Sequence, residues 1–249
     1  MLKQQNILFF LFYLASTLTF AQTLNVEFKS PPYQTTLIEL YTSEGCSSCP
    51  PADRWLSQFK QHPQLWHEVF PLAFHVDYWD YLGWRDKFAQ VQFSQRQRLH
   101  QKQGHLRSVY TPAFVINGKE WRGFFRKKRL DISNKTPVGE LKLKINQNTL
   151  SAQFTPENVY TTLHLNYAIV AMNLSNSITD GENSGHILHH DFVVLQLVKI
   201  NSKRAKSPYF WQTDFSLSKY KNYGNLAIIA WVTQSDSHEA IQTTGGRLH

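Results

Sequence analysis

The chain contains two cysteines, Cys46 and Cys49, and only two serines separate them. Such a pair can act as a redox centre, hold a soft metal ion, or form an inert cross-link. A cross-link over so short a loop removes little conformational entropy from the unfolded chain, so it stabilises a fold less than a long-range bond does. A zinc site with four cysteines is excluded, because the chain has two. The spacing therefore favours a redox role over a structural one.

A second group of reactive side chains lies in the aromatic segment FHVDYWDYLGWRD, residues 74–86. His75 or Asp77 could tune the thiols, or bind a metal beside them. Alternatively, the aromatic rings pack the loop, and Asp80 or Asp86 caps the helix that follows. The sequence leaves both interpretations open.

The elements that position the cysteine pair can be predicted from local patterns. Residues 35–42, TTLIELYT, are β-rich and mostly apolar, as a buried strand is. After Cys49, two prolines suit a first helical turn, and apolar residues then recur at helical spacing up to the next proline. We expect Cys46 at the helix N-terminus, where unpaired N–H groups favour a thiolate, although Glu44 and Asp53 nearby would raise its pKa. Cys46 would then attack, and the more shielded Cys49 would resolve the mixed disulfide.

Three further elements are predicted after this helix: a strand, a second helix and a β-hairpin. Residues 69–79 begin as a strand, and residues 86–104 carry apolar side chains at helical spacing. Residues 113–116 form a strand, and Asn117-Gly118 is typical of a two-residue hairpin turn. The order βαβαββ predicts one small α/β unit.

Together these motifs resemble a known family. The segments ELYTSEGCSSCPPAD, HVDYWDYLGWRD, VYTPAFVING and GENSGHILHHDFVV are similar to those of exported bacterial thioredoxin-like proteins known as the domain of unknown function 1223 family. The resemblance implies that the Thr111–Pro112 bond is cis, and that Thr111 and Pro112 flank the thiols and lend backbone groups to a substrate. It also implies a buried carboxylate that assists the resolving thiol. Glu39 lies near that place, one residue further from Cys46 than in thioredoxins, and could be this acid/base or point to solvent.

The second half of the chain is rich in strand patterns. Alternation in ELKLKIN, TLSAQFT and TTLHLNYAIVAM, followed by three further β-rich runs, predicts six or seven strands, with SITDGENSG as a loop. The segment HILHHD contains three histidines, but their spacing fits no standard zinc motif. We therefore predict an α/β thioredoxin-like domain (βαβαββ order) at residues 33–132, followed by a mostly antiparallel β-sandwich-like domain at residues 137–249.

The N-terminus predicts export. A lysine precedes the apolar run ILFFLFYL, and Thr19 and Ala21 are the small residues expected before a cut between Ala21 and Gln22. We therefore expect residues 1–21 to be a signal peptide and the mature protein to be periplasmic. The apolar run is too short to remain as a membrane span, and no later segment has the ~18 consecutive apolar residues of a membrane helix.

The sequence thus predicts a periplasmic thiol–disulfide oxidoreductase. Its partners would be a protein or small-molecule thiol or disulfide substrate and a redox partner, and we expect no bound cofactor. The net charge of +8 is explained by scattered lysines and arginines, so we predict no nucleic-acid partner. The alternative is a chaperone for copper or another soft metal, with Cys46, Cys49 and His75 as ligands. A third hypothesis is a binding module that has lost turnover.

Overall fold

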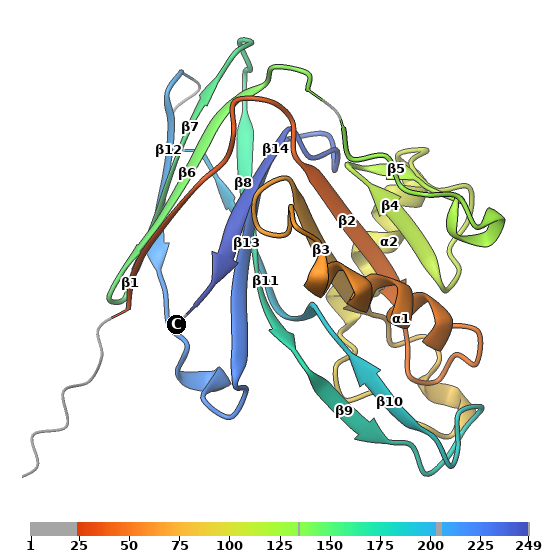
Figure 1. Cartoon of the computed structure of the whole chain (residues 1–249). Helices are drawn as coiled ribbons and strands as arrows, with labels where there is room; N and C mark the ends of the chain where they lie inside the picture. The colour runs from red at the N-terminus through yellow and green to blue at the C-terminus, as the bar shows by residue number, and fades with distance from the viewer. Residues whose placement is uncertain (1–23, 134, 203–205, 249) are drawn as a thin grey trace, which may run out of the picture.

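A computed structural model describes residues 24–133, 135–202 and 206–248 and shows a molecule built mainly from β-strands (Figure 1). Over these residues there are fourteen strands and two α-helices, α1 (Pro50–Ser57) and α2 (Val91–Lys102). Four short 3-10 helices lie at Gln58–Gln61, Asp80–Leu82, Phe124–Arg126 and Ser218–Tyr220. No helix within the described ranges is long and apolar enough to cross a membrane. The predicted signal peptide, residues 1–21, lies outside the described residues.

The largest sheet has eight strands and contains segments from both halves of the chain. Its strands, in spatial order, are β14 (Gln242–Arg247), β13 (Asn225–Gln234), β8 (Leu163–Met172), β11 (Val193–Asn201), β3 (Val69–His75), β2 (Thr36–Thr42), β4 (Ala113–Ile116) and β5 (Lys119–Glu120). β3 pairs in parallel with β2 on one side and, through Ala73 and Val193, with β11 on the other. β3 therefore connects the strand that precedes the cysteines to the second half of the chain.

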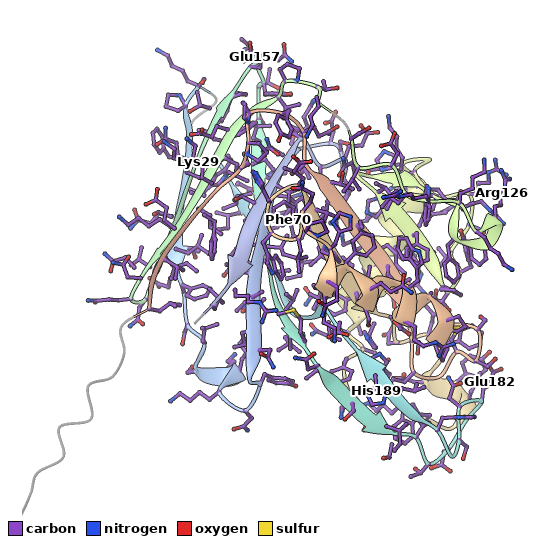
Figure 2. All side chains as sticks on the ribbon, in the orientation of Figure 1. Lys29, Phe70, Arg126, Glu157, Glu182 and His189 are labelled. Atoms are coloured by element: carbon purple, nitrogen blue, oxygen red, sulfur yellow. A yellow bond between two sulfur atoms is a disulfide. The ribbon has the colours of Figure 1, made fainter. Side chains whose placement is uncertain are left out.

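Two smaller sheets complete the fold. They are a four-stranded sheet of β1 (Asn25–Lys29), β6 (Gly139–Asn146), β7 (Thr149–Pro156) and β12 (Tyr209–Asp214), and a hairpin of β9 (Leu174–Ser177) and β10 (Ile187–His190). The four-stranded sheet shares a hydrophobic core with β8 and β13, in which Leu141, Ile169 and Ile228 are fully buried. The hairpin packs beside α1, and the loop between its strands carries Glu182 (Figure 2).

The predicted fold class is wrong, because the chain is mostly β-sheet and is not an α/β thioredoxin-like domain followed by a separate β-sandwich-like domain. The strand, helix and hairpin expected around the cysteine pair are present as β2, α1 and β4–β5, and both turn residues, Asn117 and Gly118, have positive φ. These elements do not close a unit of their own, because the second edge of β3 pairs with β11 and the sheet continues into β8, β13 and β14. The domain limits 33–132 and 137–249 stay a prediction, and strands from both ranges share this sheet.

The two helices cover opposite faces of β2, because side chains alternate along a strand. Glu39 faces α2, whose Arg96 binds it. Thr42 faces α1, and its hydroxyl donates a hydrogen bond to Asp53 Oδ2 at 3.0 Å. The loop from β2 to α1 carries both cysteines, so the α1 face of the sheet is also the face of the cysteine pair.

Candidate functional site

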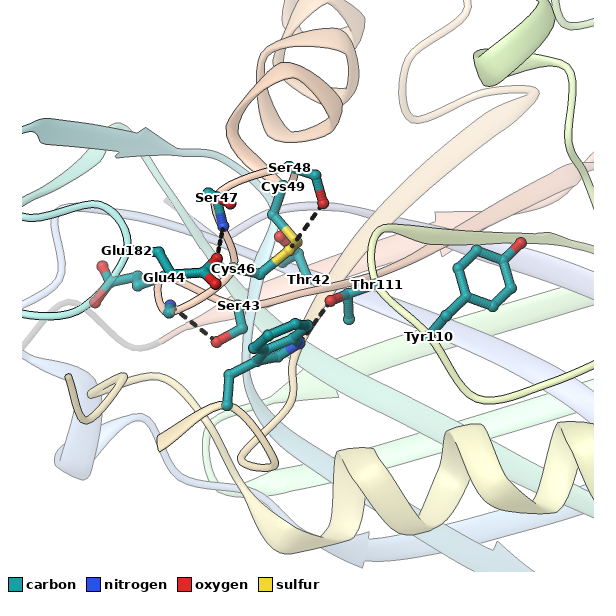
Figure 3. Close-up of a disulfide and its surroundings, with 12 residues drawn as sticks. Thr42, Ser43, Glu44, Cys46, Ser47, Ser48, Cys49, Tyr110, Thr111 and Glu182 are labelled. Carbon is teal, nitrogen blue, oxygen red and sulfur yellow. Dashed lines mark hydrogen bonds between the residues drawn. A yellow bond between two sulfur atoms is a disulfide. The ribbon is translucent and has the colours of Figure 1, made fainter. Parts of the chain in front are cut away.

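Cys46 and Cys49 form a disulfide in the loop between β2 and α1 (Figure 3). Both residues are almost completely buried, with 1% and 0% of their surface exposed, whereas Ser47 and Ser48 between them are exposed. The Ser48 Oγ lies 3.3 Å from Cys46 Sγ, and the hydroxyl must be the donor because a disulfide sulfur carries no proton. The site is therefore a buried disulfide beneath two exposed serines.

The helix begins after Cys49, so Cys46 does not lie at its N-terminus as predicted. Cys49 is the N-cap of α1, and Pro50 and Pro51 occupy the first turn. Prolines have no N–H, so this helix end offers fewer free donors than the sequence-based interpretation assumed. The Cys49 N–H itself donates to the Cys46 carbonyl at 3.1 Å. Stabilisation of a Cys46 thiolate must therefore come from other groups, and the Ser48 hydroxyl is one of them.

The Thr111–Pro112 peptide bond is cis, which confirms that prediction. Trp79 connects Thr111 to the cysteine loop: its Nε1–H donates to Thr111 Oγ1 at 2.7 Å, and a Cβ added to Gly45 would lie 3.1 Å from the Trp79 Cβ (Figure 3). Pro112 is buried next to the start of β4. Contact of Thr111 and Pro112 with a substrate stays a prediction.

Glu39 is fully buried, but it belongs to the α2 face of the sheet. Arg96 donates from Nε to Glu39 Oε2 at 2.7 Å and from Nη2 to Oε1 at 2.9 Å, and the Tyr41 hydroxyl donates to Oε2 at 3.0 Å. Burial alone would raise the pKa of Glu39, but the charges of Arg96 and His100 outweigh it and hold the pKa far below its usual range. A carboxylate that stays ionised does not exchange protons near neutral pH. The acid/base role of Glu39 stays a prediction, and the geometry favours a structural role.

Five titratable side chains are buried next to the cysteine loop: Glu44, Asp53, His75, Asp86 and His190. We call them the buried network. The His75 Nδ1 lies 2.6 Å from Asp86 Oδ2, and the His190 Nε2 lies 3.1 Å from Glu44 Oε1. The two imidazole rings meet edge to face with centroids 4.9 Å apart, and the Glu44 N–H donates to Asp86 Oδ2 at 2.9 Å. The network therefore reaches the main chain two residues before Cys46.

Three members of the buried network, Asp53, His75 and Asp86, have shifted pKa values. Burial raises the pKa of Asp53, although the charges of His190 and His75 and the hydrogen bond from Thr42 act against it. Burial would lower the pKa of His75, but the charge and hydrogen bond of Asp86 together with the charges of Asp53 and Glu44 outweigh it, and the net shift is upward. Burial would raise the pKa of Asp86, but His75 outweighs it and the net shift is downward. Asp53 is thus a carboxyl that holds its proton more tightly than in water, and it follows Cys49 by one helical turn.

The other candidate residues of the aromatic segment, residues 74–86, have hydrogen-bond partners other than the cysteines. Asp77 pairs with a serine of α2, and Asp86 accepts hydrogen bonds from its neighbours in the buried network rather than capping a helix. Within the described part of the chain, no group of three or more His, Cys, Asp or Glu side chains could hold a metal ion. The alternative trio of Cys46, Cys49 and His75 therefore does not form a metal site in this structure.

The histidines of HILHHD do not converge on one point. His190 is buried against Glu44, whereas His186 and His189 are exposed. Asp191, the next residue, pairs with Lys60 at 2.9 Å. These contacts fasten the base of the β9–β10 hairpin to the α1 side of the molecule and make no ligand cluster.

The loop between β9 and β10 brings residues from the second half of the chain to the disulfide. Glu182 Oε2 accepts a hydrogen bond from the Ser47 N–H at 3.0 Å (Figure 3). The Asn183 Nδ2 donates to the carbonyls of Glu44 at 2.8 Å and Cys46 at 3.1 Å. The sequence indicated only a loop here, because 135 residues separate Glu182 from Ser47 and no local pattern reports such a contact.

Comparisons with known proteins place the chain among proteins whose function is not established. A family model described as "Protein of unknown function (DUF1223)" matches residues 37–233. No match was found among curated proteins. The crystal structure of protein AGR_C_4864 from Agrobacterium tumefaciens is 20% identical, with a TM-score of 0.63 over 87% of this chain and 95% of that one. The structure of HBP35 of Porphyromonas gingivalis is 16% identical, with a TM-score of 0.59 over 88% and 76%. At these identities the similarity concerns the fold alone.

Proposed function

The chain belongs to DUF1223, a family of proteins of unknown function, and we propose that it is a thiol–disulfide redox protein whose reactive group is the Cys46–Cys49 pair. The observation that carries this proposal is the position of the disulfide. It joins the only two cysteines of the chain across two residues, beside a buried network of acids and histidines.

A purely structural role gives a poor account of this bond. The loop that it closes is short, and both ends of the loop are already held: β2 pairs with a strand on each side, and Thr42 binds Asp53 of α1. A cross-link there removes little conformational entropy from the unfolded chain, so it stabilises the fold little. Burying five titratable groups costs free energy, and such groups gather more often at functional sites than elsewhere. A redox role explains both the short cross-link and the buried titratable groups beside it.

The proposed exchange starts at Cys46, whose Sγ lies 3.3 Å from the hydroxyl of the exposed Ser48. A partner thiolate attacks Cys46 Sγ, the Cys46–Cys49 bond breaks, and Cys49 leaves with the electron pair and takes up a proton. A second thiolate of the partner attacks the partner sulfur of the mixed disulfide, and Cys46 leaves. The partner dithiol becomes a disulfide, and the protein gains two electrons; the reverse sequence oxidises the protein. Asp53, with its raised pKa, supports the proposal as the acid that supplies the proton to Cys49.

The test is the reduction potential of the Cys46–Cys49 pair. The protein is equilibrated in glutathione redox buffers, and free thiols are counted by mass-tagging after acid quenching, with a Cys46→Ser/Cys49→Ser variant as the tagging control. A potential between ~−270 and ~−120 mV is expected, because working dithiol proteins fall in this range. A pair that stays oxidised below ~−300 mV behaves as a structural bond, and that result would sink the proposal.

Export belongs to the same proposal. The pair needs a compartment in which a disulfide persists, and the chain begins with the apolar run and small residues of a signal peptide. We place the mature protein in the periplasm, where thiol or disulfide substrates and a redox partner would meet it.

A further inference from the structure

The disulfide is closed off in this structure, although thiol–disulfide exchange requires a nucleophile to approach a sulfur along the S–S axis. Cys46 and Cys49 expose 1% and 0% of their surface. A partner thiol therefore cannot reach either sulfur unless part of the surrounding structure moves.

The loop Ile178–His186, between β9 and β10, contacts the cysteine loop. Its tip holds the cysteine loop by three hydrogen bonds: Glu182 accepts from the Ser47 N–H, and the buried Asn183 side chain donates to the carbonyls of Glu44 and Cys46. All three bonds reach the main chain of the segment that carries the reactive sulfur.

The loop Ile178–His186 is held together by hydrogen bonds between its own residues. The Ile178 N–H donates to the His186 carbonyl at 2.9 Å, and the Gly185 N–H donates to the Ile178 carbonyl at 2.8 Å, so the loop is closed on itself. Its base has a second attachment outside the cysteine loop, because Asp191, directly after β10, pairs with Lys60 at 2.9 Å. The base therefore keeps an attachment that does not depend on the contacts of the tip.

Glu182 also competes for a donor that a thiolate would use. Pro50 and Pro51 have no N–H, and the next two N–H groups of α1, those of Ala52 and Asp53, donate to the Cys49 carbonyl. The Ser47 N–H lies next to Cys46 in the chain and is a donor that a thiolate could use. In the closed state this N–H is bonded to a carboxylate. A thiolate formed at Cys46 on reduction would lose that donor and would face the negative charge of Glu182.

We propose that the loop Ile178–His186 is a latch that keeps the Cys46–Cys49 disulfide closed, and that Glu182 and Asn183 are its positioning residues. The latch must open before a partner thiol can attack, and a thiolate at Cys46 favours the open state because Glu182 repels it. The proposal rests on the proposed redox function and describes the regulation of the same site. The other titratable groups around the cysteine loop are those of the buried network: Glu44, Asp53, His75, Asp86 and His190.

The first test is the rate at which dithiothreitol reduces the disulfide in the full mature chain. Asn183→Ala and Glu182→Gln are compared with the native protein and with Ser184→Ala as a matched control. Ser184 lies in the same loop, but its hydroxyl donates to the Thr179 carbonyl within the loop and not to the cysteine segment. Asn183→Ala should be reduced about tenfold faster, because two hydrogen bonds that hold the closed state are lost. Glu182→Gln should be about threefold faster, and Ser184→Ala should match the native rate.

A second measurement separates a latch from a loosened structure. The pH dependence of iodoacetamide reaction with the reduced protein gives the pKa of the Cys46 thiol, and Glu182→Gln should lower it by about 0.5 unit because a negative neighbour is removed. Glu182 is exposed, so this variant is expected to fold.

The outcomes distinguish the latch from the redox proposal. Native reduction rates in both Glu182→Gln and Asn183→Ala would overturn the latch, as would an equal acceleration in Ser184→Ala or an unchanged Cys46 pKa. The rate with excess dithiothreitol can be measured for any disulfide, so it tests the latch alone. The equilibrium in glutathione buffers tests the redox function, and that proposal can fail while the rates still confirm the latch.

Discussion

A substitution at Glu39 distinguishes a chemical role of this residue from a structural one. Changing it to glutamine keeps the shape of the side chain but removes its charge, and it leaves Arg96 buried, at 5% exposure, without a counter-charge. Removing one partner of a buried ion pair costs about 3–5 kcal/mol. Arg96 keeps its contacts with the rings of Phe74 and Trp231, and glutamine can still accept one hydrogen bond, so we expect the lower end, about 3 kcal/mol. This is a large part of the ~5–15 kcal/mol stability of a typical domain.

The assay is urea unfolding of oxidised protein at several pH values. The pKa of Glu39 is depressed in the folded state, so the ion pair stabilises the fold above the ordinary value of 4.5, and this contribution is lost as the pH falls towards the folded-state pKa. The difference between native protein and Glu39→Gln should therefore be fully present at pH 7 and should shrink in acid. A double variant, Glu39→Met with Arg96→Met, should recover more than half of the loss, because apolar side chains of similar volume can replace a buried ion pair.

The rate at which dithiothreitol reduces the disulfide shows which role Glu39 has. If Glu39 is structural, folded Glu39→Gln should be reduced by dithiothreitol within about twofold of the native rate at pH 7. A loss of stability below about 1 kcal/mol, which is the worth of an exposed ion pair, would refute our interpretation of the geometry. Slower exchange with native stability would refute it as well, because it would make Glu39 part of the chemistry.

Three further predictions concern Asp53, Ser48 and the N-terminus of the mature protein. Asp53→Asn should slow dithiothreitol reduction several-fold. The pKa of Asp53 is raised in the folded state, so the native protein loses stability as the pH rises above 3.8. In urea unfolding at pH 7, the variant should therefore be at least as stable as the native protein. Ser48→Ala should raise the pKa of the Cys46 thiol by about 1 unit, since the hydroxyl that donates to its sulfur is lost, and an unchanged pH profile of alkylation would exclude that role. The mature protein should begin at Gln22 by intact mass, and recovery of exported protein that retains Met1 would contradict the signal-peptide prediction.

Local sequence patterns predicted the elements next to the cysteines, but they did not predict how strands far apart in the sequence pair. The run before the cysteines and the prolines after them are local signals, and β2 and α1 lie where they indicated. The order of strands in the large sheet depends on contacts between segments far apart in the sequence. The structure shows how the strands differ: β6 alternates between buried and exposed residues, whereas all ten residues of β8 are buried. A strand with both faces covered belongs in the middle of a large sheet, which does not fit the sandwich that we predicted.

The face of β2 on which Glu39 lies was not predicted, for a similar reason. Glu39 and Thr42 are three positions apart on β2, so they point to opposite faces, and only the face of Thr42 meets α1. The carboxyl on that face comes from Asp53, four residues after Cys49 and therefore one helical turn away. The acid/base role of Glu39 stays a prediction, because the pattern along the strand does not show which helix each face meets. The contacts of Glu182 and Asn183 had no local signal at all, because they join segments that only the fold brings together.

In the proposed latch, the charges around the disulfide keep the closed site inactive. Glu44, Asp53 and Glu182 all lie near the cysteine loop, and each disfavours a thiolate at Cys46 while it is ionised. The raised pKa of Asp53 keeps its carboxyl neutral over a wider pH range than in water. His190 is hydrogen-bonded to the carboxylate of Glu44. The exposed carboxylate of Glu182 has no histidine or other cationic partner among its described contacts. Moving the latch removes that carboxylate and frees the Ser47 N–H in one step. A Cys46 pKa that falls by about 0.5 unit once Glu182 is neutralised is therefore the expected signature of this site.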